Sequence, residues 1–389
     1  MKKLLIANNN MKVGGVQKSL YNLLWAIKDE YDITLCLFEP VGEYLDKLPP
    51  SVRIVETGGL FRYLGISQGE CKTLREKLTR GFLAAWCKTF GRSGVMKLIA
   101  SGTKKLAEDF DCAIAFLHNG SQKSFYGGVQ EFVLNRVSAK RKVAFLHCDY
   151  RNCGANNKYD NALIARFDRI AACSDGCRKA FESVLPGLKN KTVTVRNCHR
   201  FDEIASMANI DPVVYDDDSV NVIMVSRLAH EKGIDRALEA LAYSLNKGVS
   251  AKLHIVGGGP MKAQLVNRAA ELGIADSVFF YGEQSNPYRY MKNADLFLVT
   301  SYHEAAPMVI EEAIFLGVPV FSVNTSSAEE MILNCSCGVV CDNTIESLSQ
   351  VLFDIISDRI ILVVLKNRVC VVNNDNLCQS AQFKSLIFE

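Results

Sequence analysis

Residues 301–322 read SYHEAAPMVIEEAIFLGVPVFS, which combines the end of one strand, a loop, a helix and the start of another strand. We expect the helix to begin with Pro307 and to end before Gly317, because proline is favoured at the first helical position and glycine just past the last. The apolar run that starts at Val318 predicts the second strand. Two strands joined by a crossover helix predict a parallel sheet in this part of the chain.

The same alternation of short β-rich runs and helical patterns continues in both directions from this segment. The strands expected in the first half are residues 3–7, 33–38, 53–56, 112–117, 142–147, 169–172 and 192–196. Those expected in the second half are residues 221–226, 252–256, 277–281, 296–300, 318–322 and 338–341. The chain is therefore predicted to be an α/β protein with two Rossmann-like halves.

The length of 389 residues also predicts two domains, since a single hydrophobic core stops growing at about 250–300 residues. The break between them is expected in the polar stretch 197–219, which gives an N-terminal domain of residues 1–200 and a C-terminal domain of residues 201–389. The acidic triplet 216–218 lies near the end of this stretch. It is interpreted as a solvated linker turn, because the chain offers no supporting ligand to complete a metal site there.

The composition is that of an ordinary globular protein, with 49% hydrophobic and 22% charged residues, and excludes a disordered or fibrous one. The formal net charge of +3 is too small to indicate a nucleic-acid partner along the whole length. No run approaches the roughly 18 apolar residues of a membrane span, and the start MKKLLIANNN does not read as a signal peptide. We therefore expect a cytoplasmic protein.

Fourteen cysteines are spread along the chain, and a cytoplasmic location predicts that their thiols are reduced. Cys335, Cys337 and Cys341 form the densest group. Their spacing matches no paired zinc pattern, and no histidine follows nearby. They are interpreted as small buried hydrophobic residues.

Residues 72–109, from Lys72 to Asp109, depart from the balanced charge of the chain, with nine basic residues against three acids. The basic residues are Lys72, Arg75, Lys77, Arg80, Lys88, Arg92, Lys97, Lys104 and Lys105. Five large apolar residues share one face of a helix predicted in this stretch: Leu78, Phe82, Leu83, Trp86 and Phe90. We favour packing of this face in the core with a solvated basic back. The alternative is a helix that rests on an anionic membrane.

Two loops carry residue types suited to an anionic ligand. Gly14 and Gly15 precede a helix in MKVGGVQKSLYNLLWAI, where a close backbone and free helix amides favour an anion. Arg227 and Lys232 follow a strand in VSRLAHEKGID, so two cations are expected to converge at the carboxyl edge of the sheet. A tight turn without ligand and a solvated surface pair are the structural alternatives.

The segment 301–322 adds two carboxylates. Glu304 lies in its loop and Glu312 on the second turn of its helix, so both can face one crevice and accept hydrogen bonds from sugar hydroxyls. The backbone amides of Met308 and Val309 at the helix start can hold phosphate oxygens. Glu311 is expected to be a solvated helix position.

Taken together, these segments resemble the family 4 glycosyltransferases, retaining enzymes of the two-domain GT-B fold, over nearly the whole chain. The motifs that carry the resemblance are GGVQKSL, FLHCDY (145–150), ACSDGCRKAF (172–181), SRLAHEKG, IVGGGP (255–260), YGEQSNPYRYMKNADLFL (281–298) and the E-x7-E spacing of Glu304 and Glu312. Many members have Gly-Phe after the first glutamate of this spacing, where this chain has Ala305 and Ala306.

The resemblance implies a role for each matching residue. Arg227 and Lys232 would clamp the donor diphosphate, Glu312 would bind the ribose, and Glu304 would contact the transferred sugar near the reaction centre. His147 matches the histidine on the acceptor side. The other positions implied to bind the donor are Met308, Val309, Gly14, Gly15, Gly257 and Gly282.

The implied function is transfer of a sugar from a nucleoside-diphosphate sugar to a glycan or lipid-linked acceptor, in surface polysaccharide synthesis. The resemblance implies a hexosyltransferase that needs no cofactor or metal, and a final segment, residues 360–389, that packs partly on the first domain. A sugar-nucleotide epimerase of the same fold and a non-catalytic nucleotide-sugar binding protein remain as alternatives.

Overall fold

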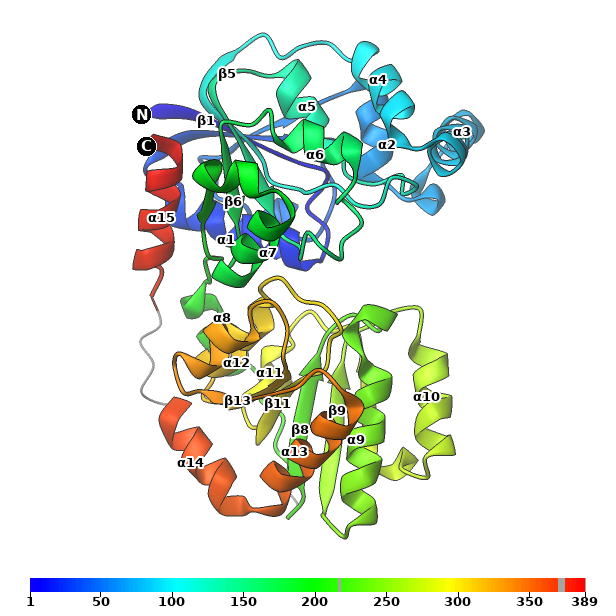
Figure 1. Ribbon diagram of the computed structural model, residues 1–389, viewed down its shortest axis with the longest axis vertical. Coiled ribbons are helices and arrows are strands. Elements are labelled where there is room, and N and C mark those ends of the chain that lie inside the picture. The colour runs from blue at the N-terminus through cyan, green and yellow to red at the C-terminus, as the bar shows by residue number, and fades with distance from the viewer. Residues whose placement is uncertain (216–217, 370–374, 389) are drawn as a thin grey trace. The chain divides into compact units, whose positions relative to one another are not determined.

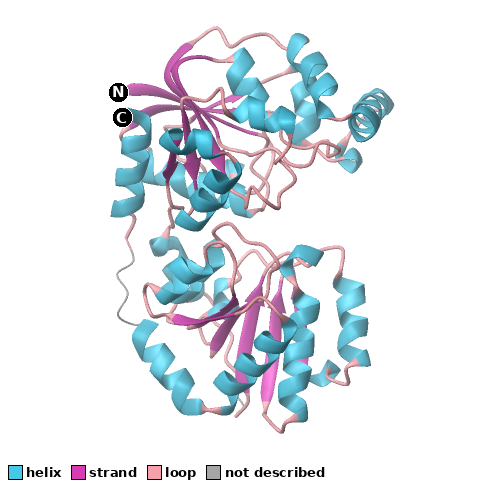
Figure 2. Ribbon diagram, in the orientation of Figure 1, coloured by secondary structure: helices cyan, strands magenta, loops and turns pink. Residues whose placement is uncertain are grey.

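The computed structural model describes residues 1–215, 218–369 and 375–388 of the chain, which form two compact units (Figure 1). Unit 1 comprises residues Met1–His199 and Asn376–Glu389, and unit 2 comprises Arg200–Asp375. Asp216 and Asp217 of the acidic triplet lie outside the described residues. The helices on both faces of each sheet are visible in Figure 2.

Unit 1 contains a seven-stranded parallel sheet in the order β3-β2-β1-β4-β5-β6-β7. Its strands are β1 (Lys2–Asn8), β2 (Tyr31–Leu37), β3 (Arg53–Glu56), β4 (Asp109–Ala115), β5 (Ser138–Leu146), β6 (Arg169–Ala172) and β7 (Thr192–Thr194). Its helices are α1 (Gly15–Ile27), α2 (Arg62–Gly65), α3 (Leu74–Phe90), α4 (Arg92–Ser101), α5 (Val129–Arg136), α6 (Lys158–Ile164), α7 (Asp175–Val184) and α15 (Leu377–Phe388).

Unit 2 contains a six-stranded parallel sheet in the order β10-β9-β8-β11-β12-β13. Its strands are β8 (Val220–Val225), β9 (Ala251–Val256), β10 (Val278–Gly282), β11 (Leu296–Val299), β12 (Val320–Val323) and β13 (Gly338–Cys341). Its helices are α8 (Phe201–Ala208), α9 (Ile234–Asn246), α10 (Lys262–Glu271), α11 (Tyr288–Met291), α12 (Met308–Phe315), α13 (Ile345–Ser357) and α14 (Arg359–Val369). All thirteen strands overlap the ranges predicted from the sequence.

Each sheet is buried on both faces, because successive side chains of a strand point to opposite sides. On β1, Leu5 packs in the cluster that contains Phe132 of α5, whereas Leu4 packs in the cluster that contains Leu20 of α1. These residues are at most 1% exposed. This is why the strands are near-continuous apolar runs in the sequence, the pattern that made them predictable.

Helix α15 packs on unit 1. Phe383, which is fully buried, lies edge-on to the ring of Tyr31 with 6.2 Å between ring centroids. The side-chain oxygen of Gln382 accepts a hydrogen bond from the backbone N–H of Arg196 at 3.0 Å. At the entrance to the helix, Asn376 and the backbone of His199 exchange two hydrogen bonds of 2.9 and 2.7 Å. The last described helix therefore completes the core of unit 1.

The prediction that the apolar face of residues 72–109 packs in the core was wrong for three of its five residues. Phe82 and Phe90 are 62% and 77% exposed, and Leu78 is 66% exposed, whereas Leu83 and Cys87 carry the packing of α3. Leu83 and Cys87 are four residues apart and so lie on one face of the helix. The helix is capped by Gly91, whose positive φ of 77° is favourable for glycine, and α4 begins at the next residue. The core-facing stripe is therefore narrow: Trp86 is half-buried against the core, and Leu78, Phe82 and Phe90 remain in solvent.

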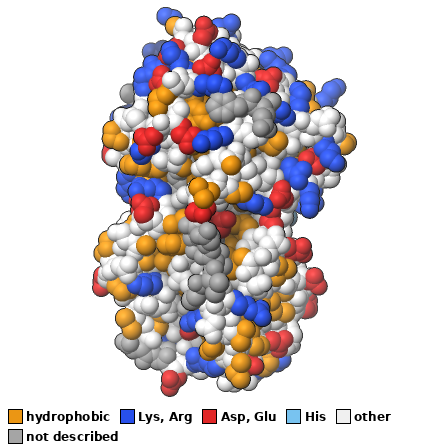
Figure 3. Space-filling view, turned by 90° about the vertical axis from the view of Figure 1, so that its left-hand side faces the viewer, with side chains coloured by type: hydrophobic (Ala, Val, Ile, Leu, Met, Phe, Trp, Pro, Cys, Tyr) orange, Lys and Arg blue, Asp and Glu red, His pale blue; other side chains and the backbone are white. Residues whose placement is uncertain are grey.

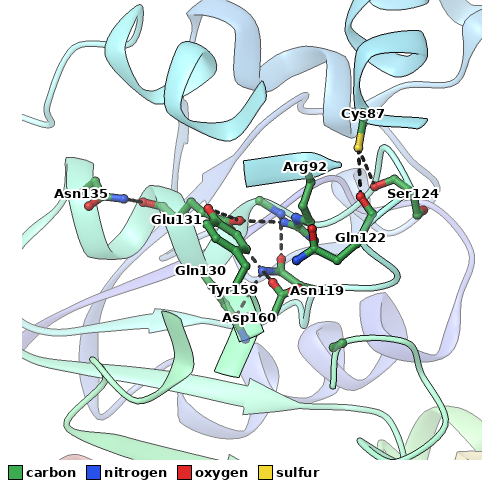
Figure 4. A network of polar contacts seen from close by, with 12 residues as sticks. Cys87, Arg92, Asn119, Gln122, Ser124, Gln130, Glu131, Asn135, Tyr159 and Asp160 are labelled. Carbon is green, nitrogen blue, oxygen red and sulfur yellow. Dashed lines mark hydrogen bonds and ion pairs between the residues drawn. The ribbon is translucent and has the colours of Figure 1, made fainter. Parts of the chain in front are cut away.

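Arg92 is not one of the solvated cations of this stretch. It is fully buried at the start of α4, and its Nη2 donates to Oε1 of Glu131 over 2.9 Å. Figure 4 shows the polar network around this pair. The Nδ2 of Asn119 donates to Oε2 of Glu131 at 3.2 Å and to Oδ1 of Asp160 at 2.9 Å, and burial raises the pKa of Asp160. The network joins α4, α5 and α6 to the loop after β4.

Surface charge is mixed on the face of the molecule drawn in Figure 3, where acidic and basic side chains are interspersed. This agrees with the small net charge of the chain. Within the described ranges, no helix has the length and apolar character required to span a bilayer.

Candidate functional site

The candidate donor site of unit 2 lies at the carboxyl edge of its sheet, where β8 and β11 are neighbours. The chain moves outward from β8 to β9 and β10 on one side and from β11 to β12 and β13 on the other. Such a point of reversal is where ligands bind in open α/β sheets. The loops that follow β8 and β11 contain the predicted Arg227, Lys232 and Glu304.

Hydrogen bonds connect these two loops to each other. The hydroxyl of Thr300 donates to the backbone carbonyls of Lys232 at 3.0 Å and Gly233 at 2.8 Å. The backbone N–H of Tyr302 donates to the carbonyl of Glu231 at 3.0 Å. Gly233 has φ 60°, and a Cβ there would lie 2.3 Å from the carbonyl oxygen of Thr300, so only glycine allows this approach. The position of Lys232 is thus set by the end of β11.

The glycine loop after β9 packs against the same region. The backbone N–H of Gly257 donates to the carbonyl of Gly282, at the end of β10, over 2.7 Å. The backbone N–H of Leu228, next to Arg227, donates to the carbonyl of Gly258 over 2.8 Å. The structure therefore brings the predicted Gly257 and Gly282 together, and the loop after β8 lies beside them.

Lys232 and Glu304 form the centre of the candidate site. The Nζ of Lys232 lies 2.6 Å from Oε1 of Glu304, and the hydroxyl of Ser301 donates to the same oxygen over 2.7 Å. The side chains of the two charged residues are 24% and 12% exposed. Charge-assisted hydrogen bonds of this kind are the strong ones in proteins. Two predicted site residues from different loops are therefore in direct contact.

Arg227 is more exposed than Lys232. Its side chain is 67% exposed and forms an ion pair with Glu231, four residues further on. Although burial opposes the change, hydrogen bonds from its own backbone and from Arg227 lower the pKa of Glu231. Each predicted cation therefore has a carboxylate neighbour on these loops.

Helix α12 differs in one detail from the prediction for residues 301–322. Pro307 is not its first helical residue, because ψ of 112° keeps it extended and the helix begins at Met308. Gly317, with φ 79°, follows the helix end as predicted. Glu312 is fully buried on the second turn, whereas Glu311 is half-buried, and so is Val309. The two adjacent glutamates thus face different surroundings.

In unit 1, the predicted Gly14 and Gly15 lie where β1 leads into α1. Gly15 is the first residue of the helix, and the carbonyl of Gly14 accepts a hydrogen bond from Lys18 N–H over 2.9 Å. The Nε2 of Gln17 lies 3.3 Å from Oδ1 of Asn9, which is buried beyond the end of β1. The turn is therefore lined by polar side chains as well as by glycine backbone.

His147 follows β5 at the carboxyl edge of the unit 1 sheet. Its ring centroid lies 4.6 Å from that of Phe116. Burial, with a smaller contribution from nearby His118, lowers the pKa of His147 to about 3. Burial alone lowers the pKa of His118 to about 4. Both imidazoles are therefore neutral near pH 7.

Sequence reasoning missed His118. It follows β4 as His147 follows β5, and these two strands are neighbours in the sheet. Its place directly beyond a predicted strand was the only signal in the sequence. No group of three or more histidine, cysteine or acidic side chains suited to a metal ion occurs among the described residues.

Residues 209–369 match the family model described as glycosyl transferases group 1. The matched region makes up most of unit 2, and we call this unit the group 1 domain for that reason. This group 1 domain contains the loops after β8 and β11 and therefore the contact between Lys232 and Glu304.

Two curated relatives are similar over part of the chain. An uncharacterized glycosyltransferase of Methanocaldococcus jannaschii is 30% identical over 161 residues, which are 40% of this chain and 39% of that protein. The GDP-mannose-dependent alpha-(1-6)-phosphatidylinositol dimannoside mannosyltransferase of Mycobacterium tuberculosis is 28% identical over 224 residues, which are 56% of this chain and 54% of that protein. The chain thus spans about half the length of the curated relatives it matches, or less.

A solved structure is similar over nearly the whole chain. The structure of HepE from Anabaena in complex with UDP and glucose has a TM-score of 0.69 and 18% sequence identity, and the match covers 99% of both chains. The prediction of a GT-B fold with two Rossmann-like units, of which the group 1 domain is one, is confirmed.

Proposed function

We propose that this protein is a retaining glycosyltransferase that moves a hexose from a nucleoside-diphosphate sugar to a glycan or lipid-linked acceptor. The observation that carries the proposal is the contact between Lys232 and Glu304 at the point where the strand order of the group 1 domain reverses. A fixed cation at such an edge suits a diphosphate, and a carboxylate beside it suits a sugar hydroxyl.

In this proposal the chemistry depends on charge. When the bond between sugar and diphosphate breaks, negative charge builds on the leaving phosphate. Arg227 and Lys232 would neutralise that charge, and the structure pairs these two cations with the carboxylates of Glu231 and Glu304. Phosphate oxygens would then replace carboxylate oxygens at each cation. No metal ion is needed for this step.

The remaining donor contacts are proposed from α12 and from the glycine turns. Glu312 would bind the ribose, and the backbone amides of Met308 and Val309 would contact phosphate. The backbone at Gly257 and Gly282 in unit 2, like that at Gly14 and Gly15 in unit 1, allows close approach of a ligand. The proposal does not specify the nucleobase of the donor, since HepE binds UDP and the mycobacterial relative is named as GDP-mannose-dependent.

The acceptor side is proposed to lie at His147. A neutral imidazole can accept a hydrogen bond from an acceptor hydroxyl, and the low pKa of His147 keeps it neutral. The mycobacterial relative acts, by its name, on a phosphatidylinositol dimannoside, which supports a lipid-linked glycan as the acceptor class. Such an acceptor is consistent with a role in surface polysaccharide synthesis.

A lipid-linked acceptor is held at a membrane, and α3 offers a surface for peripheral attachment on the cytoplasmic side. Leu74, Leu78, Phe82 and Phe90 are 62–77% exposed on this one helix. Exposed cations lie among them at Arg75, Lys77 and Lys88. Large apolar side chains beside basic ones are what binding to an anionic bilayer surface requires.

The experiment that tests the function uses a panel of UDP-, GDP- and ADP-sugars with and without glycan or lipid-linked acceptors. A transferase releases nucleoside diphosphate and extends the acceptor. An epimerase would convert the sugar nucleotide into an isomer without acceptor, and a binding protein would bind it without turnover. The assay in excess chelator also tests metal independence, because full loss of transfer restored by Mn²⁺ or Mg²⁺ would contradict it.

A further inference from the structure

A buried arginine lies beside the candidate donor site and has no part in the glycosyl transfer proposed above. Arg236 is on the first turn of α9, four residues after Lys232, and is 6% exposed. It forms no ion pair with any carboxylate of the described ranges. Burial of an arginine without a carboxylate partner costs free energy unless other groups contact its guanidinium. The contacts that this guanidinium makes therefore indicate what it does.

The first set of contacts joins the ends of three neighbouring strands. The Nη1 of Arg236 donates to the carbonyl oxygen of Thr300, directly after β11, over 3.4 Å and to Oδ1 of Asn343 over 2.7 Å. Asn343 follows β13, and its Nδ2 donates to the carbonyl oxygens of Tyr302 at 3.3 Å and Asn324 at 3.1 Å. Asn324 directly follows β12, which lies between β11 and β13 in the sheet. The arginine and Asn343 thus connect the loops at this edge.

The second contact is with the ring of Tyr302. The Cζ of Arg236 lies 4.8 Å from the centroid of this ring, within the range of a cation–π contact. The ring of His230 is stacked with that of Tyr302, with 5.2 Å between the centroids and an interplanar angle of 11°. The backbone N–H of Tyr302 donates to the carbonyl of Glu231 over 3.0 Å. Ring, N–H and carbonyl of Tyr302 therefore each have a partner outside its own loop.

Tyr302 is placed where it connects the two loops of the donor site. It lies two residues before Glu304 in the loop after β11, and it contacts the residues that directly precede Lys232 in the loop after β8. The same two loops bring Nζ of Lys232 and Oε1 of Glu304 to 2.6 Å. A side chain on a loop keeps a fixed position only when other residues hold the backbone of that loop.

We propose that Arg236, Tyr302 and Asn343 are positioning residues of the donor site, which hold the loop of Glu304 against the loop of Lys232. The guanidinium lies behind Tyr302 and Thr300 and fixes the backbone that leads to Glu304. Loss of this support should displace the carboxylate from the cation. The effect on sugar transfer rests on the proposed function, whereas the placement of the loop does not.

Hydrogen exchange at the amide of Tyr302 tests the placement of the loop without any substrate, because this N–H is bonded to the carbonyl of Glu231. Overlapping peptides from residues 299–306 of the full chain report the exchange by mass spectrometry. Arg236 is too deeply buried for a clean substitution, so the variants are made at exposed Asn343 and half-buried Tyr302. Tyr302→Ala and Asn343→Ala should each speed the exchange about tenfold.

Tyr302→Phe is the conservative variant and should exchange as the wild type does. It keeps the ring, and the Tyr302 hydroxyl has no hydrogen bond within the described part of the chain. Tyr243→Ala is the matched control, since Tyr243 is also half-buried on α9 and its ring contacts a cation, Lys247, at 4.2 Å. The ring and hydroxyl of Tyr243 contact α13, and its loss should leave the exchange unchanged. Urea unfolding of every variant separates a local change from a global one.

Steady-state kinetics then test the effect on transfer. Tyr302→Ala and Asn343→Ala should lower kcat about 10- to 100-fold and leave the KM for the acceptor unchanged, because a small misplacement of a group near the reaction centre is costly. Tyr302→Phe should keep the wild-type kcat.

Unchanged exchange at Tyr302 in both alanine variants, or an equal change in Tyr243→Ala, would overturn the proposal. Faster exchange with a normal kcat would also overturn it, since the placement of the loop would then not serve the reaction. If even the wild type transfers no sugar while the exchange responds as expected, the support of the loop is upheld and the proposed function fails.

Discussion

Lys232 and Glu304 are 72 residues apart in the chain, and yet their Nζ and Oε1 atoms lie 2.6 Å apart. The cation that is proposed to hold a diphosphate is therefore already neutralised by the carboxylate that is proposed to contact the sugar. A donor must replace this ion pair, and the exchange of partners gives the first prediction.

Glu304→Gln should bind free nucleoside diphosphate more tightly than the wild type while its turnover falls. Removing the carboxylate leaves Lys232 available to phosphate. Nucleotide binding should gain about 0.5–1 kcal/mol, since the ion pair is partly exposed.

Lys232→Ala and Arg227→Ala should instead lose about 2–4 kcal/mol of transition-state stabilisation. Titration calorimetry with UDP and GDP, together with steady-state kinetics, measures both effects. Weaker nucleotide binding by Glu304→Gln, or normal turnover in both cation variants, would contradict this account.

Glu312→Ala should abolish nucleotide affinity, whereas Glu311→Ala should be tolerated. The two residues are adjacent, but only Glu312 is fully buried, and Glu311 is half-buried. Nucleotide binding is measured for both variants after circular dichroism has shown that each is folded. The opposite order of affinities would mean that the other face of α12 meets the donor.

Arg92→Met should destabilise the protein by about 3–5 kcal/mol, because it leaves Glu131 buried without its cation. Arg75→Met, at an exposed position of α3, is the matched control and should leave the unfolding free energy unchanged. Urea unfolding measures the difference. The double variant Arg92→Met with Glu131→Leu should recover part of the loss, since neither charge is then left unpaired. Equal unfolding free energies of Arg92→Met and Arg75→Met would refute a buried ion pair between Arg92 and Glu131.

The unfolding free energy should fall as the pH drops below about 6.5, the usual pKa of histidine in an unfolded chain. Folded His147 and His118 have pKa values of about 3 and about 4, so only the unfolded chain binds their protons in this window. At pH 5 each should account for a loss of about 2 kcal/mol. Urea unfolding at pH 7 and pH 5 should show a smaller loss for His147→Asn than for the wild type. The exposed His303→Asn should behave as the wild type, and an unchanged pH dependence in both variants would count against burial.

Phe82→Ser combined with Phe90→Ser should reduce sedimentation with phosphatidylglycerol-containing vesicles, and so should Lys88→Glu combined with Lys97→Glu. Each basic residue near an anionic surface contributes about 1 kcal/mol, so the charge reversal should weaken binding at least about tenfold at low salt. Arg92 is unsuitable for this test, because its loss affects the fold.

The control for the vesicle experiment is Ile360→Ser. Ile360 on α14 is 72% exposed, comparable to Phe90, but belongs to unit 2. It should bind vesicles as the wild type does. Equal binding by every variant, or by none of the proteins including the wild type, would remove the membrane from the proposal.

The strands and the loops of the group 1 domain could be predicted because local sequence determines them. Val318 and its neighbours form an apolar run that reads as a buried strand in any context, and the spacing of Glu304 and Glu312 follows from one loop and one helix. The face of α3 could not be predicted, because burial depends on what packs against it. Leu83 and Cys87 pack in the hydrophobic core of unit 1, whereas the larger Phe82 is exposed.

Arg92 and His118 illustrate a second limit of the sequence. Among nine basic residues in 72–109, nothing local distinguishes the one that is buried, since its partner Glu131 is 39 residues away. His118 becomes a site candidate only when β4 and β5 are known to be neighbours. The roles of both residues depend on contacts with residues that are far away in the sequence, and the sequence alone does not reveal such contacts.

Helix α15 has a consequence for the order of events during synthesis. Phe383, Leu386 and Ile387 fill the same cluster as Leu4 and Tyr31, so the first and the last described strands and helices of unit 1 share one core. All of unit 2, residues Arg200–Asp375, leaves the ribosome before those three side chains do. Helix α1 covers part of that face of the unit 1 sheet, but the part that α15 covers stays exposed throughout translation of unit 2. The nascent chain therefore carries an apolar surface that a chaperone can recognise until α15 emerges.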